Sequence, residues 1–267
     1  MPVKPCWKGK DDPRPMVPGL PEVIPRARTL NALNAEMRCC TRCPLARSRT
    51  QVVTGEGSSR AEVLLIGEAP GAQEDEQGRP FVGRAGELLN RLLEIGGLDR
   101  SAVYITNIVA CRPPRNRTPN AAEIRAHGPW LDEQIRLIRP RLIVTLGRAA
   151  LGYFQPKASI AAEHGRVLRL VWQDAELAIL PTYHPAATFR RPAVKSLLES
   201  DFRRIRDVLR RLSGRPSRRS ASSAASRRER TSGAARSKRQ PRAARGSRPA
   251  KSKGRKGSDR PSRERTR

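Results

Sequence analysis

VLLIGEAPGAQEDEQGRPFVG, residues 63–83, is the stretch that decides the fold. Its first four residues are uninterrupted aliphatic side chains that end at Gly67, which is the pattern of a parallel strand covered on both faces. The remainder gathers glycines, acids and one aromatic residue into a loop. A buried strand followed by such a loop predicts an open α/β sheet, in which ligands bind beyond the carboxyl ends of the strands.

The same alternation of aliphatic runs and amphipathic stretches continues along the chain. Aliphatic runs predict three further strands, at 103–110, 142–146 and 177–180. Helical spacing of apolar residues predicts four helices, at 29–37, 86–95, 121–138 and 194–212, with a disturbance of the third near Gly128 and Pro129. Strands that alternate with helices predict a three-layer α/β/α domain around a central, mainly parallel four-stranded sheet.

Composition divides the 267 residues into three parts. Residues 1–29 form a Pro-rich N-terminal extension, residues 30–212 have the pattern of one folded domain, and residues 213–267 form a basic tail. From residue 214 onward the tail has 20 Lys and Arg against three acids, and it has no aromatic residue, Ile, Val or Leu. Such a segment buries too little apolar area to offset its ordering entropy, so we expect it to be disordered.

Charge favours nucleic acid as the partner of this chain. The formal net charge is +29, and the folded part keeps an excess of about +12 after the tail is set aside. Basic segments bind polyanions because each neutralised phosphate releases condensed counterions. We expect the tail to bind nucleic acid non-specifically. The alternatives are that it binds an anionic membrane surface or that it only keeps the protein soluble.

Neither a signal peptide nor a membrane span is evident in the sequence. The Pro-rich beginning lacks a continuous apolar stretch, and no run reaches transmembrane length. Five cysteines, an odd number in a chain without a secretion signal, favour thiol or metal chemistry over a disulfide framework. These features predict a cytoplasmic, nucleoid-associated protein that does not bind membranes. We expect it to be a monomer.

The loop after the first strand is not a nucleotide-binding loop. It lacks the Gly-Lys-Ser/Thr ending of a Walker motif and the glycine spacing of a dinucleotide fingerprint. An acidic, Gly-rich catalytic loop is the better interpretation of residues 67–83.

Five motifs together resemble the family 4 uracil-DNA glycosylases. They are residues 67–83, Cys40-Thr-Arg-Cys43-Pro44-Leu45, Asn107, Cys111-Arg-Pro-Pro and His184-Pro185-Ala186-Ala187, in that family's order and spacing. The resemblance spans about residues 38–212 and implies the uracil-DNA glycosylase fold. It also implies an enzyme that flips uracil out of single- or double-stranded DNA and hydrolyses its N-glycosidic bond in base excision repair.

The resemblance assigns roles around the flipped base. Phe81 is expected to stack on uracil, and Ala69 stands where family 1 enzymes have an Asp, so the Asp mechanism does not transfer. Asn107 is expected to accept from uracil N3–H and to donate to O4, a pattern that cytosine reverses. His184 is expected to donate to uracil O2 as negative charge builds there. Without the resemblance, Phe81 could be a core residue and Asn107 a turn former.

Hydrolysis of the N-glycosidic bond needs a carboxylate near the attacking water or the sugar, and the enzyme also needs residues that bind the DNA. Glu68, Glu74 and Asp75 are all on the catalytic loop, and the sequence does not rank them. After the His184 motif, Phe189 is expected to be the wedge that fills the space left by the base, with Arg190 and Arg191 as phosphate contacts.

The cysteines depart from the family's pattern at one position. The resemblance implies a [4Fe–4S] cluster on four cysteines, of which Cys40, Cys43 and Cys111 are present. His127 stands where the fourth is expected. The open alternatives are a cluster with three Cys and one His, recruitment of Cys39, and a Zn²⁺ site, which is what three Cys and one His suggest on their own.

Two other functions remain open at this point. One is a non-catalytic DNA-binding module that keeps the fold and the metal centre, and the presence of Glu68, Phe81, Asn107 and His184 argues against it. The other is a monofunctional glycosylase with a wider range of deaminated bases, which only the shape of the pocket would reveal.

Overall fold

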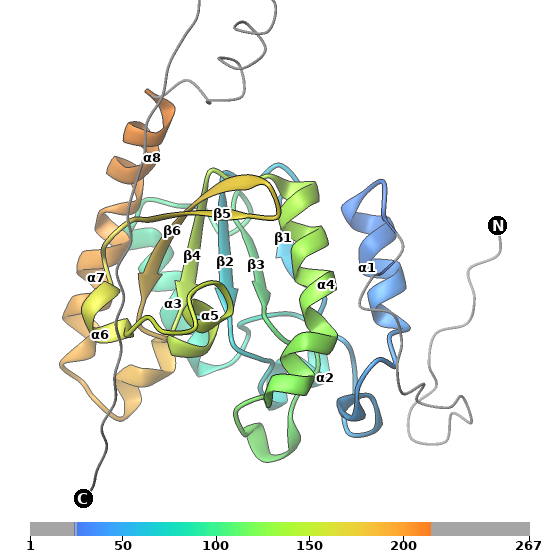
Figure 1. Cartoon of the computed structure of the whole chain (residues 1–267). Helices are drawn as coiled ribbons and strands as arrows, with labels where there is room; N and C mark the ends of the chain where they lie inside the picture. Colours follow the sequence, from blue (N-terminus) through green and yellow to red (C-terminus); the bar gives the residue numbers. More distant parts are fainter. Residues whose placement is uncertain (1–23, 25, 215–267) are drawn as a thin grey trace, which may run out of the picture. The chain divides into compact units, whose positions relative to one another are not determined.

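The computed structural model describes residues 24 and 26–214, so most of the Pro-rich extension and almost all of the basic tail lie outside the described residues. At its centre is a six-stranded sheet in the order β1-β3-β2-β4-β6-β5 (Figure 1). The strands are β1 (Glu56–Gly57), β2 (Val63–Gly67), β3 (Tyr104–Asn107), β4 (Leu142–Leu146), β5 (Leu168–Trp172) and β6 (Ala175–Thr182).

The four expected strands form the parallel centre of this sheet. β3, β2, β4 and β6 pair in parallel, whereas β1 and β5 add one antiparallel strand at each edge. The sheet therefore has two strands more than the four that the sequence predicted. Both missed strands are outer strands with one covered side, and neither has the uninterrupted aliphatic run that identified the central ones.

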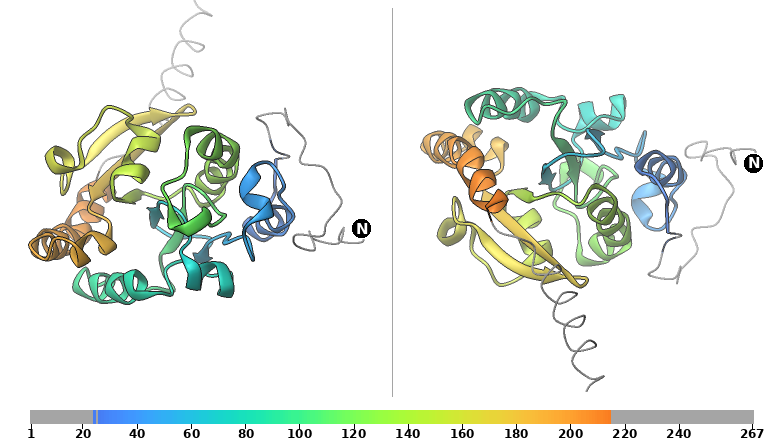
Figure 2. Two further views of the ribbon diagram at one scale, coloured as in Figure 1. Left: turned by 90° about the horizontal axis from the view of Figure 1, so that it is seen from below. Right: turned by 90° about the horizontal axis from the view of Figure 1, so that it is seen from above.

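Alternate residues of the central strands pack into two separate hydrophobic cores, one on each face of the sheet. Leu64 and Ile66 of β2 point into one core, and Val63 and Leu65 point into the other. Helices cover both faces of the sheet, as the views from below and above show (Figure 2). The three-layer α/β/α architecture that the sequence predicts is thereby confirmed.

One face carries α1 (Leu30–Arg38), α4 (Ala121–Ile138) and α5 (Arg148–Phe154). The other carries α3 (Arg84–Ile95), α7 (Val194–Arg203) and α8 (Ile205–Ser213). Short helices complete the structure in the connections, namely η1 (Pro44–Arg47), α2 (Ala72–Gln77), η2 (Pro114–Asn116), α6 (Ile160–Glu163) and η3 (Pro185–Phe189).

Two helices differ instructively from expectation. α4 continues through Pro129, and nearby backbone carbonyls receive other donors, since Arg42 Nε donates to Ala126 O and Tyr153 Oη donates to Gly128 O. The single helix expected over 194–212 is instead two, with Arg204 between α7 and α8.

Packing begins before the expected domain start at residue 30. Ile24 and Ala27 are buried in the core beneath α4, and the Ala27 backbone amide donates to Glu133 Oε1 at 2.9 Å. Arg136 Nη2 in turn donates to Ala27 O at 2.7 Å. These contacts attach the entry segment to α4.

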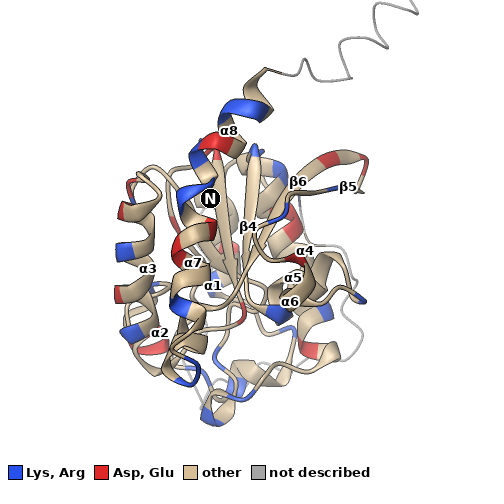
Figure 3. Cartoon of the chain, turned by 90° about the vertical axis from the view of Figure 1, so that its left-hand side faces the viewer, with Lys and Arg blue, Asp and Glu red and all other residues tan. Residues whose placement is uncertain are grey.

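The carboxyl ends of the four parallel strands meet at one edge of the sheet, at the lower end in Figure 1. Segments rich in Lys and Arg gather in the loops at that end and along α8 (Figure 3). Within residues 24 and 26–214, no helix combines the length and apolar character that a bilayer crossing requires.

Candidate active site and cysteine cluster

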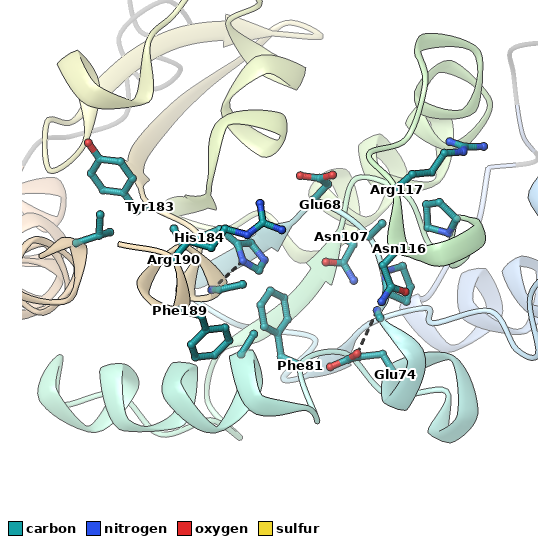
Figure 4. A pocket seen from close by; sticks show the side chains of 18 of the residues that line it. Glu68, Glu74, Phe81, Asn107, Asn116, Arg117, Tyr183, His184, Phe189 and Arg190 are labelled. Carbon is teal, nitrogen blue, oxygen red and sulfur yellow. Dashed lines mark hydrogen bonds between the residues drawn. The ribbon is translucent and has the colours of Figure 1, made fainter. Parts of the chain in front are cut away.

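A cavity of about 640 Å³ opens at the carboxyl ends of the strands. Its walls come from the loop after β2, the end of β3, the loop before α4, and the segment from Tyr183 to Val194 (Figure 4). The site residues that the sequence predicted and that line it are Glu68, Ala69, Glu74, Phe81, Asn107, His184, Phe189, Arg190 and Arg191. Topology thus brings together residues that lie more than a hundred positions apart in the chain.

Asn107 is the last residue of β3 and presents a buried acceptor to the cavity. Its side chain is almost fully buried, and Oδ1 has no hydrogen-bond partner in the structure. A buried acceptor without a partner costs free energy, so its retention at a cavity wall points to a ligand N–H. A Cβ on Gly67 would lie 2.4 Å from Asn107 Oδ1 and 2.7 Å from Phe81 Cζ. Glycine at position 67 therefore keeps this corner of the cavity open.

Phe81 is held in an unfavourable backbone conformation. Its φ is +52°, in the left-handed region that a bulky residue rarely adopts, at a cost of roughly 1–3 kcal/mol. Glu74 Oε1 accepts from the amides of Val82 and Gly83, at 3.0 and 2.9 Å, and fixes the turn that follows. Gly86 lets the start of α3 approach, because a Cβ there would lie 1.9 Å from Phe81 O.

His184 follows β6 and caps η3. Its Nδ1 accepts from the Ala186 amide at 3.1 Å, so the single N–H of the neutral ring is on Nε2. Burial lowers the pKa of His184 to about 4, with a smaller opposing effect of Glu74. The ring is therefore neutral at ordinary pH and offers an N–H donor to the cavity. The Phe81 and His184 rings are 5.7 Å apart and tilted by 31°.

The three candidate carboxylates separate clearly in space. Glu74 lines the cavity, but its oxygens are occupied by the backbone amides of Gly71, Val82 and Gly83. Asp75 is only 2% exposed and does not line the cavity, because it turns away and accepts from the amides of Thr50 and Gln51. Glu68 lines the cavity above Asn107 in Figure 4. The structure thus brings Glu68 and Glu74, but not Asp75, to the site.

The mouth of the cavity is aromatic and basic. Phe189 is 48% exposed, and the guanidinium of Arg84 lies 4.7 Å from the centre of its ring. Such a contact favours an ordered ring at an exposed position. Arg190 and Arg191 follow it and are exposed.

The loop before α4 adds residues to which the sequence assigned no role. Arg115 and Asn116 are consecutive non-glycine residues with φ of +53° and +55°. Asn116 and Arg117 line the cavity, and Arg117 forms a paired salt bridge with buried Glu123 at 2.8 and 2.6 Å. The basic run between two prolines was the signal available in the sequence, although it does not reveal the strained geometry.

A separate group of buried side chains, the cysteine cluster, consists of Cys40, Cys43, Cys111 and His127. The three cysteines are free and buried, and His127 Nε2 lies 3.4 Å from Cys43 Sγ. Buried Arg49 donates to Cys111 Sγ at 3.1 Å and to Cys40 O at 2.7 Å. Cys39 is disulfide-bonded. Among the described residues, no three His, Cys, Asp or Glu side chains are arranged to hold one metal ion as they stand.

Burial dominates the protonation of this cluster. It raises the pKa of Cys43 to about 11 and that of Cys111 to about 12, with smaller contributions from the other thiols. It lowers the pKa of His127 to about 3, with a further lowering by Arg49. Buried thiols of this kind become thiolates only when a positive charge compensates them, as a bound metal does. In donor type, three clustered thiols therefore fit a metal centre.

Comparison with known proteins places the chain in a family. Residues 54–210 match the model of the uracil DNA glycosylase superfamily. The chain is 45% identical over 186 residues to a type-4 uracil-DNA glycosylase of Sulfurisphaera tokodaii, covering 67% of this chain and 84% of the relative. Identity to the type-4 enzyme of Saccharolobus solfataricus is also 45% over 186 residues, covering 67% and 86%.

A third relative shows a similar match. The type-4 uracil-DNA glycosylase of Thermotoga maritima is 42% identical over 165 residues, which cover 62% of this chain and 85% of the relative. The match to the superfamily covers more than half of the chain and includes all the residues that line the cavity. The chain therefore belongs to the uracil-DNA glycosylase superfamily and, within it, to the type-4 uracil-DNA glycosylases.

Proposed function

We propose that this protein excises uracil from DNA by hydrolysis of the N-glycosidic bond and leaves an abasic site. The observation that carries the proposal is the pairing, in one cavity, of an unpartnered buried acceptor, Asn107 Oδ1, with a neutral donor, His184 Nε2–H. The names of the type-4 relatives support the same substrate.

Base selection rests on Asn107 and Phe81. A base that enters the cavity places its N3–H against Asn107 Oδ1 and its O4 against the amide N–H, which uracil satisfies and cytosine does not. Phe81 supplies an aromatic face on which a flipped base stacks. Because both side chains are buried and held before the base arrives, little ordering is needed when it binds.

His184 stabilises the departing base. When the bond between the sugar C1′ and uracil N1 breaks, the electron pair stays on the base, and the charge spreads to O2. The neutral Nε2–H donates a hydrogen bond to O2 as this charge develops. Removal of one preorganised donor of this type costs roughly 100- to 1000-fold in rate.

Glu68 is our proposed positioning group for the attacking water. Water adds its oxygen to C1′, and its proton passes to a carboxylate or to solvent. Among the described residues, the Glu68 carboxylate has no hydrogen-bond or ion-pair partner, whereas the Glu74 carboxylate is occupied by three backbone amides. Glu74 therefore shapes the loop, and Glu68 remains available to orient the water.

DNA contact is assigned to the mouth of the cavity. Phe189 is exposed beside it, where it is placed to fill the space that a flipped base leaves. Arg190 and Arg191 are placed to contact phosphates, and the basic tail adds non-specific attraction outside the described residues. We propose a monomer that acts on single- or double-stranded chromosomal DNA in the cytoplasm.

The cysteine cluster is assigned to a [4Fe–4S] centre. Cys40, Cys43 and Cys111 would hold it, and these three residues lie in the segment after α1 and in the loop after β3, which the centre would join. Uracil excision as described above transfers no electron, so we assign this centre a structural role. The disulfide at Cys39 supports leaving that residue out of the ligand set. Zinc is the alternative metal, and metal analysis distinguishes the two.

Cleavage of uracil-containing oligonucleotides tests the proposal. Wild-type protein is expected to leave alkali-sensitive sites in single- and double-stranded uracil DNA but none in the cytosine equivalents. His184→Ala is expected to lose roughly 100- to 1000-fold in the single-turnover rate constant. His164→Gln is the matched control, because His164 lies outside the cavity and pairs with Asp201. This variant is expected to keep most of the wild-type rate constant.

Two outcomes would contradict this function. Absence of cleavage by metal-replete wild type, with DNA binding intact, would identify a non-catalytic binding module. Excision of deaminated purines as fast as uracil would replace the proposed specificity with a wider one.

A further inference from the structure

The ring proton of His127 is located by its hydrogen bonds. The backbone amide of Ala110 donates to His127 Nδ1 at 3.2 Å. An amide nitrogen is a donor only, so Nδ1 is the acceptor of this bond, and a neutral imidazole has one N–H. That N–H is therefore on Nε2, the nitrogen that lies 3.4 Å from Cys43 Sγ.

This arrangement is the reverse of that found at metal-bound histidines. A histidine that ligates a metal through one nitrogen normally donates its other N–H to a carboxylate, a carbonyl or water. In His127 the other nitrogen faces a donor, and Nε2 carries the proton in place of the lone pair that a metal requires. The ring is thus set to donate an N–H···S hydrogen bond to Cys43.

A second donor supports the same interpretation of the cluster. Arg49, 5% exposed, donates through Nη1 to Cys111 Sγ at 3.1 Å and is fixed through Nη2 to Cys40 O. Two of the three sulfurs therefore receive hydrogen bonds from buried side chains. Hydrogen bonds to thiolate sulfur withdraw charge from it and are one of the ways in which proteins tune iron–sulfur centres.

We propose that His127 is a positioning residue and not a ligand, so that the metal centre of this chain is bound by the thiolates of Cys40, Cys43 and Cys111 alone among the described residues. A cluster held in this way would have no fourth ligand from the described residues, and a small molecule such as water or a thiol would have access to it. This inference rests on the cluster assignment made under the proposed function, and it concerns how this chain differs from a four-cysteine site.

Iron and sulfide retention tests the proposal without reference to catalysis. Anaerobically purified wild type, His127→Gln and His127→Cys are exposed to an iron chelator, and iron and sulfide per chain are followed in time. His127→Gln is expected to release iron within about twofold of the wild-type rate, because its amide N–H still donates to sulfur. His127→Cys is expected to release iron roughly 10-fold more slowly, because a thiolate is added to the site. Cys43→Ser is the control that loses iron in any case.

Spectroscopy gives an independent answer. Pulsed EPR of the reduced cluster in protein labelled with ¹⁵N-histidine is expected to show only the weak nitrogen coupling of a hydrogen bond. Added thiol is expected to change the EPR spectrum of wild type but not that of His127→Cys. A strong iron-bound nitrogen coupling, or loss of iron from His127→Gln as fast as from Cys43→Ser, would overturn the proposal.

Metal identity and activity separate this inference from the proposed function. Wild type that contains zinc, or no metal, overturns the three-thiolate iron centre even if uracil excision is normal. Absence of uracil excision in protein with the expected iron retention counts against the glycosylase function and leaves the assignment of His127 standing.

Discussion

Space beside Gly67 decides whether the candidate site can accept a base. A Cβ at this position would overlap both Asn107 Oδ1 and Phe81 Cζ, so Gly67→Ala is expected to displace the two side chains that we propose to read and stack the base. We expect a loss of roughly 100-fold in kcat/KM for uracil DNA. Gly152→Ala in α5 is the matched control, because a Cβ there meets nothing within 4 Å. Neutral surface substitutions typically change such values by about twofold. A kcat/KM of Gly67→Ala within that range of Gly152→Ala would contradict this account.

The role proposed for His184 predicts how catalysis depends on pH. Its pKa lies at about 4 instead of 6.5, because burial disfavours the imidazolium. The neutral donor persists as pH falls through 6.5 and is lost only as pH approaches 4, where a proton on Nδ1 would also break the bond from the Ala186 amide. Single-turnover rate constants for uracil excision are expected to show no acidic limb near pH 6.5. A loss of rate as pH falls through 6.5, absent from His184→Asn, would show that burial does not lower this pKa, and a loss of rate as pH rises through 6.5 would show that the charged ring is the active form.

At the scale of elements, the short helix α2 is attached to neighbouring segments by the carboxylates of Glu74 and Asp75. Glu74 holds the turn before α3 and Asp75 holds the segment at Thr50 and Gln51. Asp75→Asn is expected to lower the free energy of unfolding by about 1–3 kcal/mol, because an amide cannot accept both backbone bonds without turning a donor toward one of them.

Chemical denaturation and a uracil excision assay at low temperature check this separation of roles. Asp75→Asn is expected to be destabilised but to keep its rate constant, because the residue does not line the cavity. Glu68→Gln is expected to lose rate with unchanged stability. A catalytic defect of Asp75→Asn as large as that of Glu68→Gln, at full folding, would restore Asp75 as a catalytic candidate.

At the scale of the whole molecule, charge is distributed unequally between the tail and the domain. The tail from residue 214 has a net charge of +17 of the total +29. Truncation after Gly214 is expected to make the plot of log K against log salt less steep, by about 0.9 for each duplex phosphate that the tail neutralises. Binding titrations at several salt concentrations measure it. The single-turnover rate constant at saturating protein is expected to stay unchanged, because the cavity residues all precede the truncation. An unchanged slope would identify the tail as solubilising.

The sequence by itself determined the architecture and named many of the residues that line the cavity. Uninterrupted aliphatic runs predicted the four parallel strands, because a strand buried on both faces leaves that pattern, and α4 was predicted at its observed bounds. The resemblance to family 4 implied that Phe81, Asn107 and His184 share one site, and the structure places all three on the wall of one cavity, where the carboxyl ends of the parallel strands meet.

Only the tertiary structure decided what those residues can do. Local sequence could not rank Glu68, Glu74 and Asp75, because the ranking depends on which backbone amides approach each carboxylate from distant segments. It could not show the strain at Phe81 or at Arg115, nor the two edge strands, which lack a continuous apolar pattern. The tautomer of His127 likewise depends on the amide of Ala110, 17 residues away in the chain, since a histidine takes its protonation pattern from its neighbours in space.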